Sequence, residues 1–210
     1  MSRIDCYNKN VYLKFKRFKY KMLNAKYLLF DFETSGIGDF KRQKALQLAW
    51  QLCDSGMQTL ETHSYYFNDI TEWNTDFHKN ITTEFMEKNG RDPKLILNLF
   101  LTHCCIVFSN KGQMIAHNIS FDFQILNNEY QQNQIHHFKI NEFKNILYCT
   151  MKNTVNLCGI PKTHGGGNKY PRLSELYTFL YKKEPDLILH EASNDVEILR
   201  RCCQKLFNNS

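Results

Sequence analysis

The sequence predicts a mixed α/β domain. Three strand candidates come first and are joined by short turns, which is typical of an antiparallel meander. Candidate helices then alternate with short strands over the rest of the chain, a pattern typical of a sheet that is flanked by helices. The length of 210 residues suits one domain with a substantial core.

The three strand candidates are residues 27–33, 45–54 and 60–68. The first is a short apolar run that ends in acidic residues, as a buried strand with a polar end would. Ser55-Gly56 lies between the second and third candidates and is typical of a hairpin turn. We therefore expect three antiparallel strands, with the acidic residues on the first.

Helix and strand candidates alternate in the remaining chain. Asp92 and Pro93 have the residue types of an N-cap and of a first helical position. The expected elements are a helix from Thr82 to Asn89, a helix from Asp92, a strand at 113–117, a helix at 121–130, a strand at 146–151, and helices at 173–181 and 194–206.

The net charge of +6 is concentrated at the N-terminus. Residues 1–26 hold eight basic residues against Asp5 alone, whereas residues 27–210 hold 19 basic and 20 acidic residues. We expect residues 1–26 to be a flexible basic leader, and the alternatives are an auxiliary contact with nucleic acid and a nuclear address. Any phosphate-binding surface of residues 27–210 must then be a local patch.

Composition also bears on localisation. No apolar run approaches the roughly 20 residues of a membrane span, and the N-terminus lacks the apolar segment of a secretory signal. Eight cysteines without such a signal favour free thiols in a reducing compartment. We expect an intracellular protein without a membrane partner, cytoplasmic or, through its leader, nuclear.

A glycine run, Gly165-Gly166-Gly167, lies between two expected elements. Such a run cradles phosphate when a helix N-terminus follows it directly. Here Pro171 and Arg172 intervene, so we interpret the run as a flexible connector.

Acidic side chains in three short motifs predict the functional site. Asp31 and Glu33 lie two residues apart on the first strand, so their side chains share one face. Asp122 lies in the first turn of an expected helix, and Asp195 follows Ser193, a natural N-cap of the last helix. Carboxylates that converge without basic partners repel one another unless hard cations neutralise them. The pattern predicts a metal-dependent hydrolase, with phosphodiesters as the expected substrate.

Histidines accompany two of these motifs. His190 lies on the loop before the last helix, five residues before Asp195, where it can act as a general base near neutral pH. His117 and Asn118 come just before Asp122. They either hydrogen-bond a phosphate or support the acidic side chains, or they only satisfy a turn, and both interpretations stay open.

The three motifs resemble those of the DEDDh exonuclease superfamily, which includes the proofreading subunit of bacterial DNA polymerase III. The matching segments are Asp31-Phe32-Glu33-Thr34-Ser35-Gly36, His117-Asn118-Ile119-Ser120-Phe121-Asp122 and His190 to Asp195, within residues 27–206. The resemblance implies a ribonuclease H-like fold over residues 27–210, with a central mixed sheet of five strands flanked by helices. It also implies a 3′-to-5′ exonuclease that hydrolyses single-stranded nucleic acid, DNA in preference to RNA, to nucleoside monophosphates.

The resemblance assigns roles to individual residues. Asp31, Glu33 and Asp195 would hold one Mg²⁺ or Mn²⁺, and Asp31 would bridge to a second ion. Asp122 would act directly or through a water ligand. His190 would deprotonate the attacking water. This agrees with the chemistry of the carboxylates themselves, because two cations about 4 Å apart can stabilise both the attacking and the leaving oxygen.

The resemblance also places residues against the substrate. Ile37 takes the position of an apolar wedge against the terminal bases, and the backbone of Thr34 that of a contact with the terminal 3′-hydroxyl. His117 and Asn118 complete the expected substrate-binding set. The expected partner is nucleic acid with a free 3′ end, together with a polymerase or repair protein.

Three alternatives remain at this point. A nucleic-acid-binding or polymerase-associated module of the same fold would bind without turnover, although all four carboxylates and the histidine are present. An endonuclease or integrase-like relative of the broader fold is disfavoured by the histidine motif. An RNA-directed exonuclease would use the same chemistry, since the two sugars are distinguished only by contacts to the 2′-hydroxyl.

Overall fold

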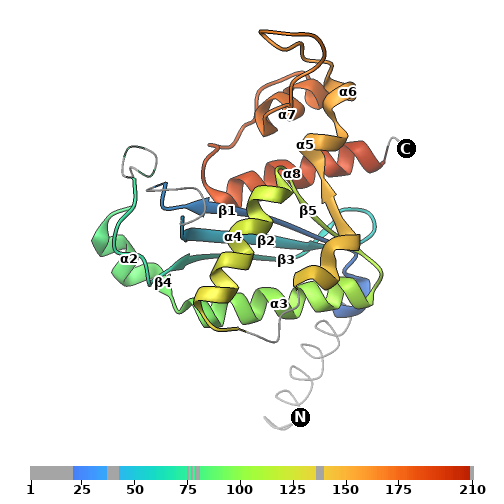
Figure 1. Ribbon diagram of the computed structural model, residues 1–210. Helices are drawn as coiled ribbons and strands as arrows, with labels where there is room; N and C mark the ends of the chain where they lie inside the picture. The colour runs from blue at the N-terminus through green and yellow to red at the C-terminus, as the bar shows by residue number, and fades with distance from the viewer. Residues whose placement is uncertain are drawn as a thin grey trace, which may run out of the picture.

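A computed structural model of the protein describes residues 21–36, 43–74, 76, 78, 81–135 and 140–208 (Figure 1). Most of the expected leader and the expected wedge residue, Ile37, lie outside the described residues. None of the helices in the described part of the chain is long and apolar enough to cross a membrane.

A mixed sheet forms the centre of the fold (Figure 1). Its strand order is β4-β3-β2-β1-β5-β6. The strands β1, β2 and β3 pair antiparallel, whereas β5 and β6 continue the sheet in parallel from β1. The predicted meander and the mixed sheet are therefore confirmed. The strands are β1 (Tyr27–Thr34), β2 (Ala45–Cys53), β3 (Thr59–Phe67), β4 (Gly90–Arg91), β5 (Gln113–Ala116) and β6 (Leu147–Cys149).

The sheet has six strands rather than the expected five. The additional strand, β4, consists of Gly90 and Arg91 alone and pairs in parallel with the end of β3. Two residues are too few to show a hydrophobic period. The expected helix stop at Asn89-Gly90 is correct, because α2 (Thr83–Asn89) ends there, and the same glycine then begins β4.

Helices cover both faces of the sheet (Figure 1). On one face, α3 (Pro93–Ser109) and α4 (Ile119–Gln132) pack against the large apolar core of β1 and β2. On the other face lies α8 (Ala192–Phe207), with α7 (Leu173–Tyr181) packed against it. Every residue of β2 is buried, because this strand is covered on both faces. Three further short helical elements are η2 (Ile140–Ile146), α5 (Thr150–Asn153) and α6 (Val155–Cys158), and residues 21–24 are helical as well.

The helix boundaries agree with the predictions in some places and differ in others. Asp92 caps α3 by accepting a hydrogen bond from the backbone N–H of Lys94 at 2.8 Å. The last helix begins earlier than expected, at Ala192, with Glu191 rather than Ser193 as its N-cap. The strand expected at 146–151 is also shorter, because β6 ends at Cys149 and a helical turn follows.

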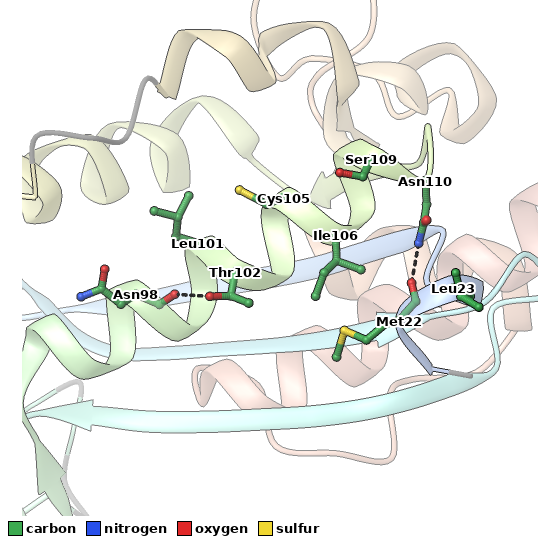
Figure 2. A pocket seen from close by; sticks show the side chains of 9 residues that line it. All are labelled: Met22, Leu23, Asn98, Leu101, Thr102, Cys105, Ile106, Ser109 and Asn110. Carbon is green, nitrogen blue, oxygen red and sulfur yellow. Dashed lines mark hydrogen bonds between the residues drawn. The ribbon is translucent and has the colours of Figure 1, made fainter. Parts of the chain in front are cut away.

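Residues 21–26, which the sequence analysis assigned to the leader, lie against the body of the protein. The side chain of Asn110 donates hydrogen bonds to the carbonyls of Met22 and Ala25 at 2.7 and 2.9 Å. Met22 and Leu23 also line an open cavity of about 550 Å³ beside α3 (Figure 2). We therefore propose that residues 21–26 belong to the domain rather than to the leader.

Candidate active site

The first two carboxylates, Asp31 and Glu33, lie near the C-terminal end of β1. Alternate residues of a strand share a face, so both side chains continue the row that begins with Leu29. Leu29 packs against Ala192 and Val196 of α8. The packing of β1 against α8 therefore directs both carboxylates towards the first turn of that helix, which contains Asp195.

Asp122 reaches the same place from the opposite face of the sheet. It lies in the first turn of α4 and is 2% exposed. Its Oδ1 accepts a hydrogen bond from the backbone N–H of Phe32 at 3.2 Å. Because Phe32 separates Asp31 from Glu33, this bond fixes the start of α4 at the acidic end of β1.

His190 and Asp195 are joined by a hydrogen bond at the start of α8. The backbone N–H of His190 donates to Asp195 Oδ2 at 3.2 Å. His190 has a φ of 68°, a left-handed conformation that is uncommon for a residue with a side chain. Ligand atoms of Glu33, His190 and Asp195 all lie within 4.8 Å of one another. The third motif is thus brought to the first.

Burial and mutual repulsion disfavour the ionised forms of these carboxyl groups. Loss of hydration, together with the negative charges of Asp195 and Asp122, raises the pKa of Glu33 to about 8. The same two effects raise the pKa of Asp31 well above its ordinary value. Burial is also the main cause that raises the pKa of Asp122 to about 7 and that of Asp195 to about 6.

These residues fit a site for hard divalent cations. Mg²⁺ and Mn²⁺ prefer oxygen ligands, and four carboxyl groups meet here. Asp195 Oδ1 is buried and has no hydrogen-bond partner among the described residues. A buried oxygen without a partner is costly, and a bound cation would remove that cost.

We expect the protein in EDTA to lose stability as the pH rises from about 4 to about 8. In the unfolded chain, carboxyl groups lose their protons near pH 4. In the folded protein, Glu33 keeps its proton up to about pH 8. The folded state therefore binds more protons in this range, and the free energy of unfolding falls with pH. Urea unfolding at pH 5, 6.5 and 8 measures the slope.

Two controls separate the acidic site from other groups. Burial also raises the pKa of Glu129 to about 7, which adds to the slope with the same sign. In Asp31→Asn, the slope of the unfolding free energy against pH should lose only the contribution of the acidic site. Mn²⁺ at pH 8 should restore the stability of the unsubstituted protein. A stability that rises between pH 5 and pH 8 in EDTA would contradict the assignment.

A buried glutamine of β2 holds the start of α8. Gln47 is 1% exposed and is the cross-strand neighbour of Glu33. Its Oε1 accepts a hydrogen bond from the backbone N–H of Ala192 at 3.1 Å, and its Nε2 donates to Ser64 Oγ at 3.0 Å. The side chain of the N-cap residue, Glu191, makes no hydrogen bond that caps α8. The sheet therefore supplies the cap, and β2 positions the turn that carries the last carboxylate.

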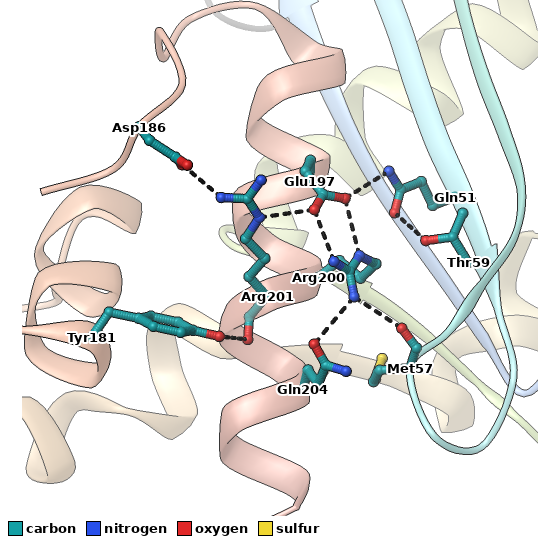
Figure 3. Close-up of polar contacts among 9 residues, drawn as sticks. All are labelled: Gln51, Met57, Thr59, Tyr181, Asp186, Glu197, Arg200, Arg201 and Gln204. Atoms are coloured by element: carbon teal, nitrogen blue, oxygen red, sulfur yellow. Dashed lines mark hydrogen bonds and ion pairs between the residues drawn. The ribbon is translucent and has the colours of Figure 1, made fainter. Parts of the chain in front are cut away.

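A second set of polar contacts fixes α8 further along β2 (Figure 3). Glu197 accepts hydrogen bonds from Gln51 Nε2 at 3.2 Å and from Arg200 Nη2 at 2.8 Å. Arg200 in turn donates to the carbonyl of Met57 at 3.0 Å. These contacts were not predicted from the sequence. The available signal was a pair of glutamines, Gln47 and Gln51, four residues apart in an otherwise apolar strand.

The expected substrate-binding residues have different surroundings. The ring nitrogens of His117 already have partners, Thr150 Oγ1 and the carbonyl of Pro171, both at 2.9 Å. We therefore interpret His117 as a structural link between these segments, and its contact with phosphate stays a prediction. Asn118 is exposed at the N-cap of α4, and its side chain makes no capping hydrogen bond. Ile37 is not among the described residues.

The carbonyl of Thr34 accepts a hydrogen bond from His78 Nε2 at 2.9 Å. His78, which the sequence analysis did not single out, also lines a cavity of about 400 Å³ together with His190. Tyr66 and Ile188 contribute to the same wall. This volume lies within the usual range of ligand pockets, roughly 300–1,000 Å³.

Glu61, His63 and His103 form a second group with potential ligand atoms within 4.8 Å of one another. Trp50 Nε1–H donates to His103 Nδ1 at 2.9 Å, so the proton of the neutral ring lies on Nε2 and faces Glu61. A cation on Nε2 would move this proton to Nδ1, where it would face the indole N–H. We therefore interpret this group as a hydrogen-bonded cluster rather than a metal site.

No protein-family model matches the sequence. Among curated proteins, a DNA polymerase III PolC-type protein of Mycoplasmopsis pulmonis (strain UAB CTIP) is 26% identical over 190 residues. The match covers 89% of this chain but only 12% of that protein. The chain therefore spans about an eighth of its curated relative.

Solved structures share the architecture over most of this chain. E. coli Exonuclease I in complex with a dA16 oligonucleotide has a TM-score of 0.68 at 16% identity, over 88% of this chain and 41% of that one. The nuclease domain of 3′hExo, a DEDDh family member bound to rAMP, has a TM-score of 0.69 at 13% identity, over 89% and 94% of the two chains. The chain thus has the ribonuclease H-like fold of the DEDDh exonucleases that its motifs predicted.

Proposed function

We propose that the protein is a divalent-metal-dependent 3′-to-5′ exonuclease that hydrolyses single-stranded nucleic acid, DNA in preference to RNA, to nucleoside monophosphates. The observation that carries this proposal is the convergence of four carboxyl groups with His190 at the end of β1. The oligonucleotide bound to E. coli Exonuclease I supports the proposed class of substrate.

Asp31, Glu33, Asp122 and Asp195 would hold two Mg²⁺ or Mn²⁺ ions. When bound, the ions supply charge neutralisation at the scissile phosphate and activation of water. The chain contributes the placement of these ligands. Phe32 holds Asp122 through its backbone N–H, and the N–H of His190 holds Asp195. Because these carboxyl groups are pre-positioned, little reorganisation is needed when the substrate arrives.

His190 is the proposed general base. Its side chain is exposed and lines the cavity beside the acidic site, so a water molecule can reach its ring. Its backbone is held by Asp195 in the left-handed conformation. The ring accepts the proton of the attacking water and releases it to solvent, which an imidazole does readily near neutral pH.

The remaining site residues position the strand. The proposed contact of the Thr34 backbone with the terminal 3′-hydroxyl is supported by His78, which fixes the Thr34 carbonyl. Asn118, exposed beside Asp122, is the proposed polar contact with the terminal nucleotide. Ile37 remains the proposed wedge. For His117 we propose a positioning role, because its ring holds Thr150 and Pro171.

The relative named DNA polymerase III PolC-type makes a polymerase the protein partner that we propose. Such a partner would present a 3′ end to the cavity beside His190. The alternative is a module that keeps the fold and binds a strand without cleaving it. The two proposals differ in turnover alone.

A time course on 5′-labelled single-stranded DNA and RNA oligonucleotides tests the proposal, with Mg²⁺, Mn²⁺ or EDTA. We expect a ladder that shortens from the 3′ end, that is absent in EDTA, and that progresses faster on DNA. A circular single strand should stay intact. Tight binding without any product in either metal would favour the binding module instead.

A further inference from the structure

The basic residues of the domain are unevenly distributed. Residues 143–174 hold five basic residues and no acidic residue, whereas the rest of residues 27–210 holds 14 basic and 20 acidic residues. The rest of residues 27–210 therefore repels a polyanion on average. A strand that enters the acidic site needs a surface that attracts its phosphates, and residues 143–174 have the charge for such a surface on the domain.

Residues 150–172 of this segment form a projection made of α5, α6 and a closed loop. Figure 1 shows α5, α6 and α7 together at the top, beyond α8 and the start of α4. A bridge between Pro161 and Asn168 closes the loop, and the N–H of Lys162 donates to the carbonyl of Gly167 at 3.1 Å. A Cβ at Gly165 or Gly166 would meet no atom within 4 Å, so the tip of the loop is open.

His117 attaches both ends of this segment to the rim of the acidic site. Its ring contacts Thr150 at the start of α5 and Pro171 just before α7. Lys152 Nζ donates to Ser120 Oγ at 3.2 Å. Ser120 lies in the first turn of α4, two residues before Asp122. The basic segment therefore borders the place where the carboxyl groups converge.

The side chains of this segment suit a single strand. Lys152, Lys162 and Arg172 are exposed, and Tyr170 between them has 58% of its surface exposed. Lys169 differs, because it forms an ion pair with a glutamate of α7. Exposed cations that alternate with an aromatic ring bind phosphates and stack on bases without sequence preference.

We propose that Lys152, Lys162, Tyr170 and Arg172 form a basic ledge that binds the single strand on the 5′ side of the scissile phosphodiester. The direction of the strand rests on the proposed function, since the 3′ end must occupy the acidic site. The ledge binds the phosphate backbone of several nucleotides, and its effect therefore grows with the length of the substrate.

The test is the double variant Lys152→Glu/Lys162→Glu, with Lys94→Glu/Lys111→Glu as a control of identical charge change. Lys94 and Lys111 lie in and just after α3, and Lys111 is at the opposite end of β1 from the carboxyl groups. Fluorescence anisotropy measures the binding of 5′-labelled dT16 and rU16 in EDTA at several salt concentrations. Circular dichroism verifies that each variant is folded. If the double variant does not fold, the single variant Lys162→Glu takes its place in the binding measurement.

We expect the ledge variant to bind both strands about tenfold or more weakly, and the slope of log K against log salt to fall by about 0.7 for each lost contact. The control should retain the affinity of the unsubstituted protein. Equal affinity and equal salt slope in all three proteins would overturn the proposal.

A kinetic measurement separates this inference from the proposed function. The ratio of kcat/KM for dT16 to that for a dinucleotide should fall in the ledge variant, because a dinucleotide has a single phosphodiester and reaches fewer residues of the ledge than dT16 does. If the unsubstituted protein hydrolyses neither substrate, the exonuclease proposal fails, while binding in EDTA still decides for or against the ledge. Selective weakening of rU16 alone would contradict a contact with the shared phosphate backbone.

Discussion

Replacement of Asp31 by asparagine should abolish metal-dependent digestion of oligonucleotides while it stabilises the metal-free protein. Burial and repulsion from all three neighbouring carboxyl groups, Glu33, Asp122 and Asp195, together raise the pKa of Asp31. A neutral amide removes that repulsion, and it also removes an anionic ligand. Loss of a residue that only supports a metal ligand typically costs about 10–100-fold, so loss of the ligand itself should cost about 10³-fold or more.

The two effects of Asp31→Asn have opposite directions, which makes the result diagnostic. Activity is measured as release of nucleotides in Mn²⁺, and stability as the urea midpoint in EDTA at pH 8. Asp54→Asn is a matched control, because Asp54 lies in the turn after β2 and asparagine keeps the oxygen that accepts from Gly56 and Gln58. Full activity in Asp31→Asn would refute the proposed metal site, and a loss of activity caused by unfolding would appear in the urea midpoint.

Replacement of His190 by alanine should reduce the rate by about 10²–10⁴-fold at neutral pH, which is the usual contribution of general-base catalysis. The cause is the loss of the only proposed proton acceptor for the attacking water. Asp195 keeps the backbone N–H of residue 190 as a donor, so the carboxyl group should stay in place. The defect should shrink at alkaline pH, where hydroxide is more abundant.

Two readouts distinguish a general base from a metal ligand, because His190 lies within reach of both Glu33 and Asp195. Added imidazole should partly restore the rate of His190→Ala if the lost group is a base. Mn²⁺ affinity, measured by calorimetry, should be nearly unchanged. A steep loss of Mn²⁺ affinity would instead make His190 a ligand, and an unchanged pH–rate profile would exclude the base.

The sequence predicts those parts of the fold whose signals are local. The apolar run of β1, the Asp92-Pro93 start of α3 and the period of α7 need no information from the rest of the chain. The strand predicted at 146–151 was wrong in its second half, where α5 begins at Thr150, because a distant contact bends the backbone there. The N–H of Met151 donates to the carbonyl of His117, and this bond turns the chain from β6 into α5.

In the candidate site, too, some residues have a local signal in the sequence and others act through distant contacts. Its carboxyl groups and His190 stand out by residue type and spacing, and the structure brings Glu33, His190 and Asp195 together. Their roles stay predictions. Gln47 and His78 carry no comparable local signal, since each acts through a contact with a distant backbone atom. Such residues become visible only when the strands and helices are placed relative to one another.

The position of α8 has a consequence for the time at which activity would appear. The bond between Gln47 and Ala192 joins residues that are 145 positions apart, and Asp195 lies beyond it. On the ribosome, β1, β2 and β3 emerge before α8, and Asp195 arrives with α8, which must dock over this long separation. A growing chain therefore carries an incomplete set of ligands while its own messenger RNA is nearby, and cleavage would begin only after synthesis and docking of α8 are finished.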